Sequence, residues 1–284
     1  DMTNQTIDNG RLRLMERLGE GGYGVVYRAV DDSSTTSSSH PAPKEYAVKV
    51  LVKAEPSGHY WHFQSREIAI HKFVSNHPNV LTLHEVIEDD WFIYLVLDYC
   101  PGGDLFTAII ERHSFCGKDD LVRKIFVQIL DAVQHCHDKG IYHRDLKPEN
   151  IMCSQDGTEI KLGDFGLATN SRMSNTFGCG SSYYVSPECI GVEFNKRPYP
   201  TQHSDTWALG IILTNMIAGR SPWSYATKDD QCFLRYTANP NYLREMLPIS
   251  EGASHILKRV FTFDPYTRIS IPELREEILK LERF

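Results

Sequence analysis

Two patterns of apolar spacing divide the chain. In roughly the first hundred residues, apolar and polar positions alternate in short runs, a spacing typical of half-buried β-strands. After Pro101 the apolar positions recur every three or four residues, which indicates amphipathic helices. The change predicts a β-rich first third followed by a larger helical part, so the expected fold class is α+β.

The β-rich part is expected to form an antiparallel meander of about five strands. Two short strands are predicted within residues 11–30, and a Ser- and Thr-rich segment from Asp31 to Pro43 predicts a flexible connection after them, because it cannot bury apolar surface. The remaining predicted elements are strands over Tyr46–Val52, Val80–Val86 and Trp91–Leu97 and a short helix over Ser65–Val74.

The helical part is expected to follow a linker at Asp98–Gly103, where Pro and Gly break the pattern. Its predicted helices are Asp120–Asp138, His203–Gly219, Glu251–Phe261 and Pro272–Leu281. The second of these is almost wholly apolar, which predicts burial on all sides.

Composition and charge exclude several classes of protein. With 284 residues and 41% hydrophobic content, the chain can bury a sizeable core. The net charge is −7 without a sustained basic run, which argues against nucleic acid as a partner. No apolar run reaches the roughly 20 residues of a membrane helix, and no signal or transit peptide is visible, so no membrane partner is expected. Seven scattered cysteines without a Cys-x-x-Cys pair predict reduced thiols and a cytoplasmic or nuclear location.

The candidate chemistry centres on residues 142–150, which read YHRDLKPEN, and on the GDFG that follows. Asp145 can orient a hydroxyl nucleophile and take its proton. Asn150 and Asp164 carry oxygen ligands suited to magnesium on a triphosphate. Lys147 can neutralise charge on a phosphoryl group in transfer. This set of side chains predicts phosphoryl transfer.

Two features of the β-rich part complement that chemistry. Residues 19–24, GEGGYG, fit G-x-G-x-x-G, but a strand follows rather than the helix of a Rossmann fold. A strand–turn–strand loop over phosphates and an ordinary tight hairpin both fit this motif when it is taken alone. Lys49 lies inside an apolar strand and needs an anion there. Glu67 and nucleotide phosphates are the expected partners, although Glu67 on a solvated helix face is the alternative.

These motifs, with Ser186-Pro187-Glu188 and the DTWALG run that begins at Asp205, resemble the eukaryotic serine/threonine protein kinases over residues 12–281. The resemblance implies a bilobal kinase-like fold with a small antiparallel β-rich N-lobe, one main helix in it, and a larger α-helical C-lobe. The implied limits are N-lobe 11–97, hinge 98–103, C-lobe 104–284 and activation segment 164–188. Residues 99–106 and 179–189 are similar to fungal kinases that respond to nutrients or meiosis.

The resemblance also implies the reaction and its residues. ATP and Mg²⁺ would be the cofactors, and Ser or Thr hydroxyls of proteins the acceptors. Asp145, Lys147, Lys49, Glu67 and Ser181 would be the catalytic residues, with Asn150 and Asp164 on the metal. The implied nucleotide contacts are Leu18, Gly19, Glu20, Gly21, Gly22, Gly24, Val26, Ala47, Lys49, Leu97, Asp98, Cys100, Asp104 and Met152. Two structural roles are implied as well: Glu188 pairs with Arg268, and Asp205 braces the catalytic loop.

The activation segment departs from the family pattern at Phe177, which stands where many members carry a phosphorylatable Thr. Arg144 would pair with that phosphate. Thr176 or Ser174 could serve instead, but we expect Phe177 to pack and make activity independent of phosphorylation.

A second departure is His71, one turn after Glu67, where the family's internal stack usually has Leu or Met. Its expected neighbours in that stack are Leu83, His143 and Phe165. A neutral histidine there can stack on Phe165, whereas protonation would weaken the contact.

Substrate preference and alternatives follow from the same comparison. Asp104 and Glu149 could read a basic residue of a peptide, although Asn215 stands where basophilic kinases often carry a second acid. The alternatives are a pseudokinase acting as a scaffold and a kinase of small molecules. The oligomeric state is open, with a monomer favoured.

Overall fold

The computed structural model describes residues 1–21, 24–33, 43–56 and 58–284. The chain forms two compact units, the first made of residues 1–76 and 81–101 and the second of residues 77–80 and 102–284. The first holds a curled sheet and one long helix, and the second is mainly helical, so the α+β class is confirmed. Among the described residues, no helix combines the length and apolar character needed to cross a bilayer.

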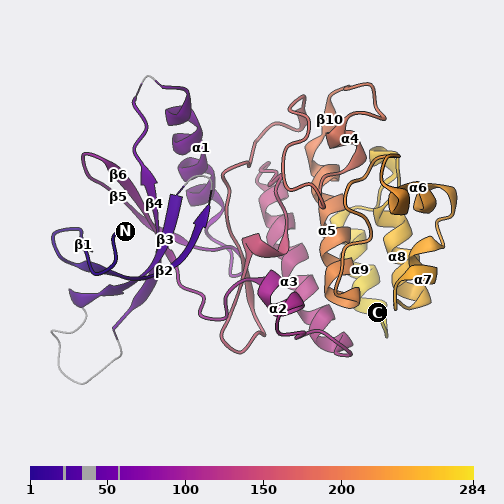
Figure 1. The fold of residues 1–284 in the computed structure, drawn as a ribbon, viewed down its shortest axis with the longest axis horizontal. Helices are drawn as coiled ribbons and strands as arrows, with labels where there is room; N and C mark the ends of the chain where they lie inside the picture. Colours follow the sequence, from indigo (N-terminus) through magenta and orange to yellow (C-terminus); the bar gives the residue numbers. More distant parts are fainter. Residues whose placement is uncertain (22–23, 34–42, 57) are drawn as a thin grey trace. The chain divides into compact units, whose positions relative to one another are not determined.

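The first unit is built on a six-stranded antiparallel sheet in the order β1-β2-β3-β4-β6-β5 (Figure 1). The predicted simple meander is therefore wrong at one place, because β6 and not β5 pairs with β4. A helix lies between β4 and β5 in the chain. After this helix, β5 forms the edge of the sheet, and the β5–β6 hairpin then brings β6 back beside β4. The strands are β1 Thr6–Ile7, β2 Leu12–Gly21, β3 Gly24–Asp31, β4 Glu45–Val52, β5 Leu83–Glu88 and β6 Phe92–Asp98.

Helix α1, His59–Val74, is longer than predicted and lies beside this sheet in Figure 1. Its extra turns escaped the sequence analysis because the usual start signals are missing. Gly58 supplies no side-chain cap, and Tyr60 and Trp61 are exposed rather than part of an apolar stripe.

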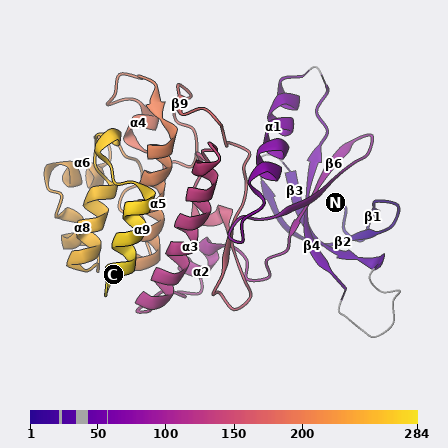
Figure 2. The ribbon, with the colours of Figure 1, turned by 180° about the vertical axis from the view of Figure 1, so that it is seen from behind.

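The second unit packs four long helices, α3 Asp119–Asp138, α5 Thr201–Ala218, α8 Glu251–Val260 and α9 Ile271–Lys280. Helix α3 contacts α5 and α9, and α8 contacts the same two helices, as Figure 2 shows from behind. All four were predicted to within two residues at each end. Each of them buries most of the residues that defined its apolar pattern.

Helix α5 is buried on nearly all sides, as its apolar sequence predicted. Gly210 of α5 packs closely against α8, where a Cβ on this glycine would come within 2.5 Å of Val260 Cγ1. Trp207 is fully buried and packs against Trp223 and Phe261. The helix therefore forms the centre of the unit.

Short elements complete the second unit, and the sequence analysis did not predict them because each is too brief to show a period. The helices are α2 Leu105–Ile110, α4 Pro187–Ile190, α6 Gln231–Ala238 and α7 Tyr242–Met246. The 3-10 turns are η2 Pro148–Asn150 and η3 Pro265–Thr267. The strand pairs are β7 Ile151–Cys153 with β8 Ile160–Leu162 and β9 Met173–Ser174 with β10 Tyr199–Pro200.

The predicted strand over Val80–Val86 begins later than expected. Val80 forms a parallel bridge with Leu162 of β8. The Asn79 amide donates to Gln128 Oε1 at 2.9 Å and to the Ile160 carbonyl at 3.0 Å. These bonds hold residues 77–80 in the second unit, and β5 starts only at Leu83.

Candidate active site

The lysine predicted to need an anion has one. Lys49 on β4 donates from Nζ to Glu67 Oε1 of α1 at 2.6 Å. The side chains are only 14% and 6% exposed, so each charge depends on the other in a poorly solvated place. The alternative of Glu67 on a solvated helix face is thereby excluded.

We expect Glu67→Gln to lower kcat/KM for ATP roughly 10- to 100-fold, which corresponds to about 1.4–2.7 kcal/mol of transition-state stabilisation. The amide keeps the shape of Glu67 but removes the charge that fixes Lys49. Steady-state phosphorylation at varied ATP measures the effect. Glu55→Gln is the matched control, because Glu55 is exposed and outside this pair. An equal loss in both variants would contradict the assignment.

The described part of the glycine-rich segment lies on two paired strands, as the sequence predicted. Gly21 at the end of β2 pairs with Gly24 at the start of β3, while Gly22 and Tyr23 lie outside the described residues. A Cβ on Gly24 would lie 2.3 Å from the Val50 carbonyl oxygen, so only glycine fits there. No Rossmann-type helix follows in the described residues. The last six residues of β2 are exposed, and they include the predicted contacts Leu18, Gly19, Glu20 and Gly21.

Three further residues predicted to contact the nucleotide, Val26, Ala47 and Leu97, lie on adjacent strands of the first unit. Ala47 on β4 pairs with Leu97 on β6, and Val26 on β3 pairs with Lys49. Ala47 and Leu97 are buried, whereas Asp98 and Cys100, which end the unit, are half-buried.

Two of the predicted contacts already have structural partners. The Asp98 carboxylate accepts hydrogen bonds from Thr82 N at 2.9 Å and His84 Nε2 at 2.7 Å. In the second unit, Asp104 bridges to Met152 and caps α2 by accepting from Thr107 N at 2.7 Å. The nucleotide roles of these residues stay predictions.

The catalytic loop and the activation segment bring together three of the predicted catalytic residues, Asp145, Lys147 and Ser181. Asp145 Oδ1 accepts hydrogen bonds from Ser181 N and Oγ, both at 3.0 Å. Lys147 Nζ donates to Asp145 Oδ2 at 2.9 Å and to Ser181 Oγ at 2.8 Å. The loop and the activation segment therefore meet at one carboxylate, which is held in a fixed orientation.

The two predicted metal ligands differ in their surroundings. Asn150 donates from Nδ2 to the Asp145 carbonyl at 2.8 Å, and its Oδ1 accepts no hydrogen bond from the described residues. Asp164 is exposed and has a left-handed backbone, with φ of 57°. An amide oxygen and a carboxylate are ligands that Mg²⁺ prefers, so both residues fit the ion.

Asp205 on α5 braces the catalytic loop, as the resemblance implied. Its oxygens accept from His143 N at 2.9 Å, Arg144 N at 2.8 Å and His137 Nε2 at 2.8 Å. Burial would raise the pKa of the Asp205 carboxyl, but these hydrogen bonds, led by that from His137, leave the pKa below its usual value. An ionised carboxylate can thus hold Arg144, whose φ of 63° is unusual for a residue with a side chain.

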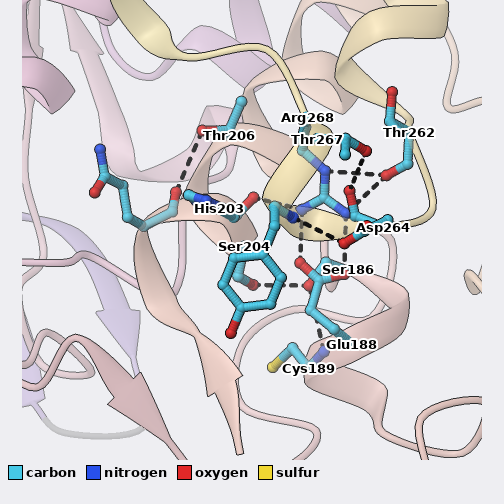
Figure 3. A network of polar contacts seen from close by, with 12 residues as sticks. Ser186, Glu188, Cys189, His203, Ser204, Thr206, Thr262, Asp264, Thr267 and Arg268 are labelled. Carbon is cyan, nitrogen blue, oxygen red and sulfur yellow. Dashed lines mark hydrogen bonds and ion pairs between the residues drawn. The ribbon is translucent and has the colours of Figure 1, made fainter.

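A buried ion pair joins the end of the activation segment to η3 (Figure 3). Arg268 Nη1 and Nη2 donate to Glu188 Oε1 and Oε2 at 2.6 and 3.0 Å. The two side chains are 0% and 2% exposed. The same guanidinium donates to the carbonyls of Thr262 and His203, so it joins three segments of the chain.

Phe177 packs as expected. Its ring centroid lies 6.0 Å from that of Tyr199, and a Cβ on Gly191 would come within 2.7 Å of the Phe177 ring. Next to it, the Tyr199 hydroxyl donates to the Thr176 carbonyl at 3.1 Å. Packing therefore holds this part of the activation segment in place.

Arg144 has partners within the same segment. Its Nε donates to the Leu167 carbonyl at 2.8 Å, and Nη1 lies 3.4 Å from Ser174 Oγ. These are neutral acceptors, and Ser174 is itself buried. These two neutral groups of the activation segment orient the arginine.

The surroundings of His71 explain how a polar residue is tolerated there. It is buried on α1, and its Nε2 lies 2.7 Å from the Leu81 carbonyl oxygen. In the second unit His143 and Phe165 pack at 5.1 Å between ring centroids. Stacking of His71 on Phe165 and its pH dependence stay predictions.

The sequence analysis missed two residues that shape the site. Gly180 has a φ of 103°, and a Cβ there would lie 2.6 Å from the Arg144 carbonyl oxygen, so only glycine lets the activation segment approach the catalytic loop. A glycine directly before Ser181 was the available signal. His137 donates to Asp205, but a histidine late in a helix gives no such signal.

Comparisons with known proteins agree with this geometry. The Schizosaccharomyces pombe protein named "Negative regulator of sexual conjugation and meiosis" is 43% identical over 282 residues, covering 93% of this chain and 58% of that protein. The "Serine/threonine-protein kinase VHS1" of Saccharomyces cerevisiae is 31% identical over 333 residues, covering 95% of this chain and 70% of that protein. The "Serine/threonine-protein kinase ksp1" of S. pombe is 35% identical over 276 residues, covering 94% of this chain and 56% of that protein.

The chain thus spans less than two thirds of two of these relatives. The names of the two kinases support phosphoryl transfer to Ser or Thr and disfavour a pseudokinase, and the resemblance to fungal regulatory kinases is confirmed. The protein kinase domain family matches residues 12–279. Since that match covers nearly the whole chain, this chain belongs to the protein kinase family.

Proposed function

We propose that this protein transfers the γ-phosphoryl group of ATP to Ser and Thr hydroxyls of protein substrates. The observation that carries the proposal is the arrangement of Asp145, Lys147 and Ser181, in which one fixed carboxylate is bonded from both sides. Asp145 orients the acceptor hydroxyl and takes its proton, while Lys147 offsets the charge that develops on the phosphoryl group. Replacement of Asp145, described in the Discussion, tests this proposal.

Protein kinases use ATP and Mg²⁺, and the residues of this chain fit both. We propose that Lys49, held by Glu67, contacts the phosphates and that Asn150 and Asp164 hold the metal. The bound ion would supply charge neutralisation on the triphosphate. The adenine would contact Val26, Ala47, Leu97, Asp98, Cys100 and Met152, with Asp104 near the ribose.

We also propose that activity does not require a phosphate on the activation segment, because Phe177 and Arg144 are already packed and bonded. Phosphatase treatment, Thr176→Ala and Ser174→Ala are each expected to leave kcat within about threefold of the untreated enzyme, a change of about 0.7 kcal/mol in the barrier. Peptide phosphorylation rates, with mass spectrometry to confirm dephosphorylation, measure this. A loss of tenfold or more on phosphatase treatment, restored by a phosphorylating kinase, would show dependence.

The cellular role and location are further proposals. The name of the S. pombe relative supports a role in restraining conjugation and meiosis. Seven free thiols support a cytoplasmic or nuclear location. A monomer is the simplest form of the enzyme. Expression of this chain in fission yeast lacking that relative is expected to restore the restraint. Failure to do so, with a catalytically active chain present, would count against the role.

A further inference from the structure

A pocket of about 290 Å³ lies in the second unit beside the residues that hold Asp145. The catalytic loop contributes Glu149 to its lining, and the activation segment contributes Tyr183 and Tyr184. Both segments continue directly from the residues bonded to Asp145, with the tyrosines two and three places after Ser181. A peptide segment flanking the acceptor hydroxyl is therefore within reach of the pocket.

One wall of the pocket is apolar and remains open. It is formed by Phe106, Ile109 and Ile110 of α2. Phe106 and Ile110 are 38% and 37% exposed, and Tyr183 is 48% exposed. Large apolar side chains left open inside a concave site favour an apolar occupant, because that occupant would remove their surface from water.

The floor of the pocket is polar but neutral and already satisfied. The Tyr184 hydroxyl donates to Asn215 Oδ1 at 3.0 Å, and Asn215 Nδ2 donates to Ser221 Oγ at 3.0 Å. Burial, and to a smaller degree the charge of Glu149, raise the pKa of Tyr184 well above its usual value, so the phenol stays neutral. Among the described residues, no acid at the floor offers an arginine a partner.

The charges around the pocket oppose one another. Among the described residues that line it, Glu149 is the acid and Arg220 the base, and both are exposed. Arg220 is oriented by a hydrogen bond from Nη2 to the Met246 carbonyl at 2.5 Å. A basic side chain in the pocket would be attracted by Glu149 and repelled by Arg220. The two charges offset each other, so the pocket has no net charge that would favour a basic side chain.

We propose that this pocket selects an apolar side chain, such as leucine, methionine or phenylalanine, at one position of the substrate peptide and disfavours arginine there. The inference rests on the proposed kinase function. It differs from the basic preference expected from Glu149 alone, because Asn215 supplies no second acid and Arg220 offsets the first. Asn215 and Arg220 are then specificity-determining residues.

A positional peptide library around one Ser acceptor tests the proposal. The wild-type enzyme is expected to prefer leucine over alanine and over arginine by roughly tenfold at a single position. Ile110→Ser should bring the kcat/KM of the leucine peptide down to that of the alanine peptide. Leu234→Ser, which changes a side chain 39% exposed on α6, is the matched control and should keep the wild-type preference. Arg220→Glu with Asn215→Asp should raise the rank of arginine at that position.

Binding measurements separate this inference from the proposed function. Fluorescence anisotropy of the labelled leucine and arginine peptides with the Asp145→Asn variant reports the pocket without phosphoryl transfer. If no peptide is phosphorylated but the leucine peptide binds more tightly, the kinase proposal fails and the pocket assignment holds. Arginine enrichment at the position in the wild-type enzyme, lost in Glu149→Gln, would overturn the inference. An apolar preference unchanged by Ile110→Ser would overturn it as well.

Discussion

Asp145→Asn is expected to lower kcat for peptide phosphorylation by about 10²–10⁴-fold, the range typical of general acid–base catalysis. The amide keeps the shape of the side chain and still accepts a hydrogen bond from Ser181, but it cannot take a proton. It also removes the charged acceptor of the Lys147 ammonium, which lies 2.9 Å away in the wild-type protein.

The nucleotide affinity of the Asp145→Asn variant is expected to stay within about threefold of wild type, because the proposed role of Asp145 is on the acceptor and not on ATP. Calorimetric titration with ATP and Mg²⁺ measures that affinity, and a radiolabel transfer assay measures kcat. Asp229→Asn is the control, since this aspartate is exposed and lies outside the site. A variant at Asp145 that retained the wild-type rate would refute the assigned reaction.

Arg268→Met is expected to reduce the free energy of unfolding of the second unit by about 3–5 kcal/mol. The change leaves the Glu188 carboxylate buried without a counter-charge, and it removes the donors to the carbonyls of Thr262 and His203. Urea unfolding followed by tryptophan fluorescence suits this region, because the guanidinium lies 5.0 Å from the Trp207 ring.

The double variant Arg268→Met with Glu188→Met is expected to recover part of that loss, since no buried charge remains unpaired. Arg259→Ala gives the exposed comparison. Its closest contact with Glu273 is 3.7 Å, the two side chains are 38% and 59% exposed, and an effect below about 1 kcal/mol is expected. Equal effects of Arg268→Met and Arg259→Ala would contradict the structural role given to the buried pair.

The candidate reacting groups could be named from the sequence because their chemistry depends on short spacings along the chain. Asp145, Lys147 and Asn150 lie in one loop, where six residues contain the carboxylate, the ammonium and the amide. Lys49 in an apolar strand predicted an anionic partner, because burying an unpaired ammonium costs free energy in any fold. The long helices could likewise be predicted, since their apolar positions repeat over several turns.

The contacts that assemble these groups were decided by the tertiary structure. Ser181 meets Asp145 across 36 positions of sequence, and Arg268 meets Glu188 across 80. Without the resemblance to protein kinases, neither pairing could be read from the sequence, because many charged and polar residues are available at such separations. Gly180 illustrates the reason. The need for glycine at this position becomes visible only in the folded structure, where the Arg144 carbonyl leaves no room for a side chain.

The sequence by itself determined which residues are the candidates for the chemistry and which helix faces are apolar, because both are local properties of residue type and spacing. Only the tertiary structure decided that β6 and not β5 lies beside β4, and that Asn215 and Arg220 join Glu149 around one pocket. Strand order and pocket lining depend on packing between distant segments. That packing is a balance of shape, burial and charge over the whole unit, which no short window of sequence contains.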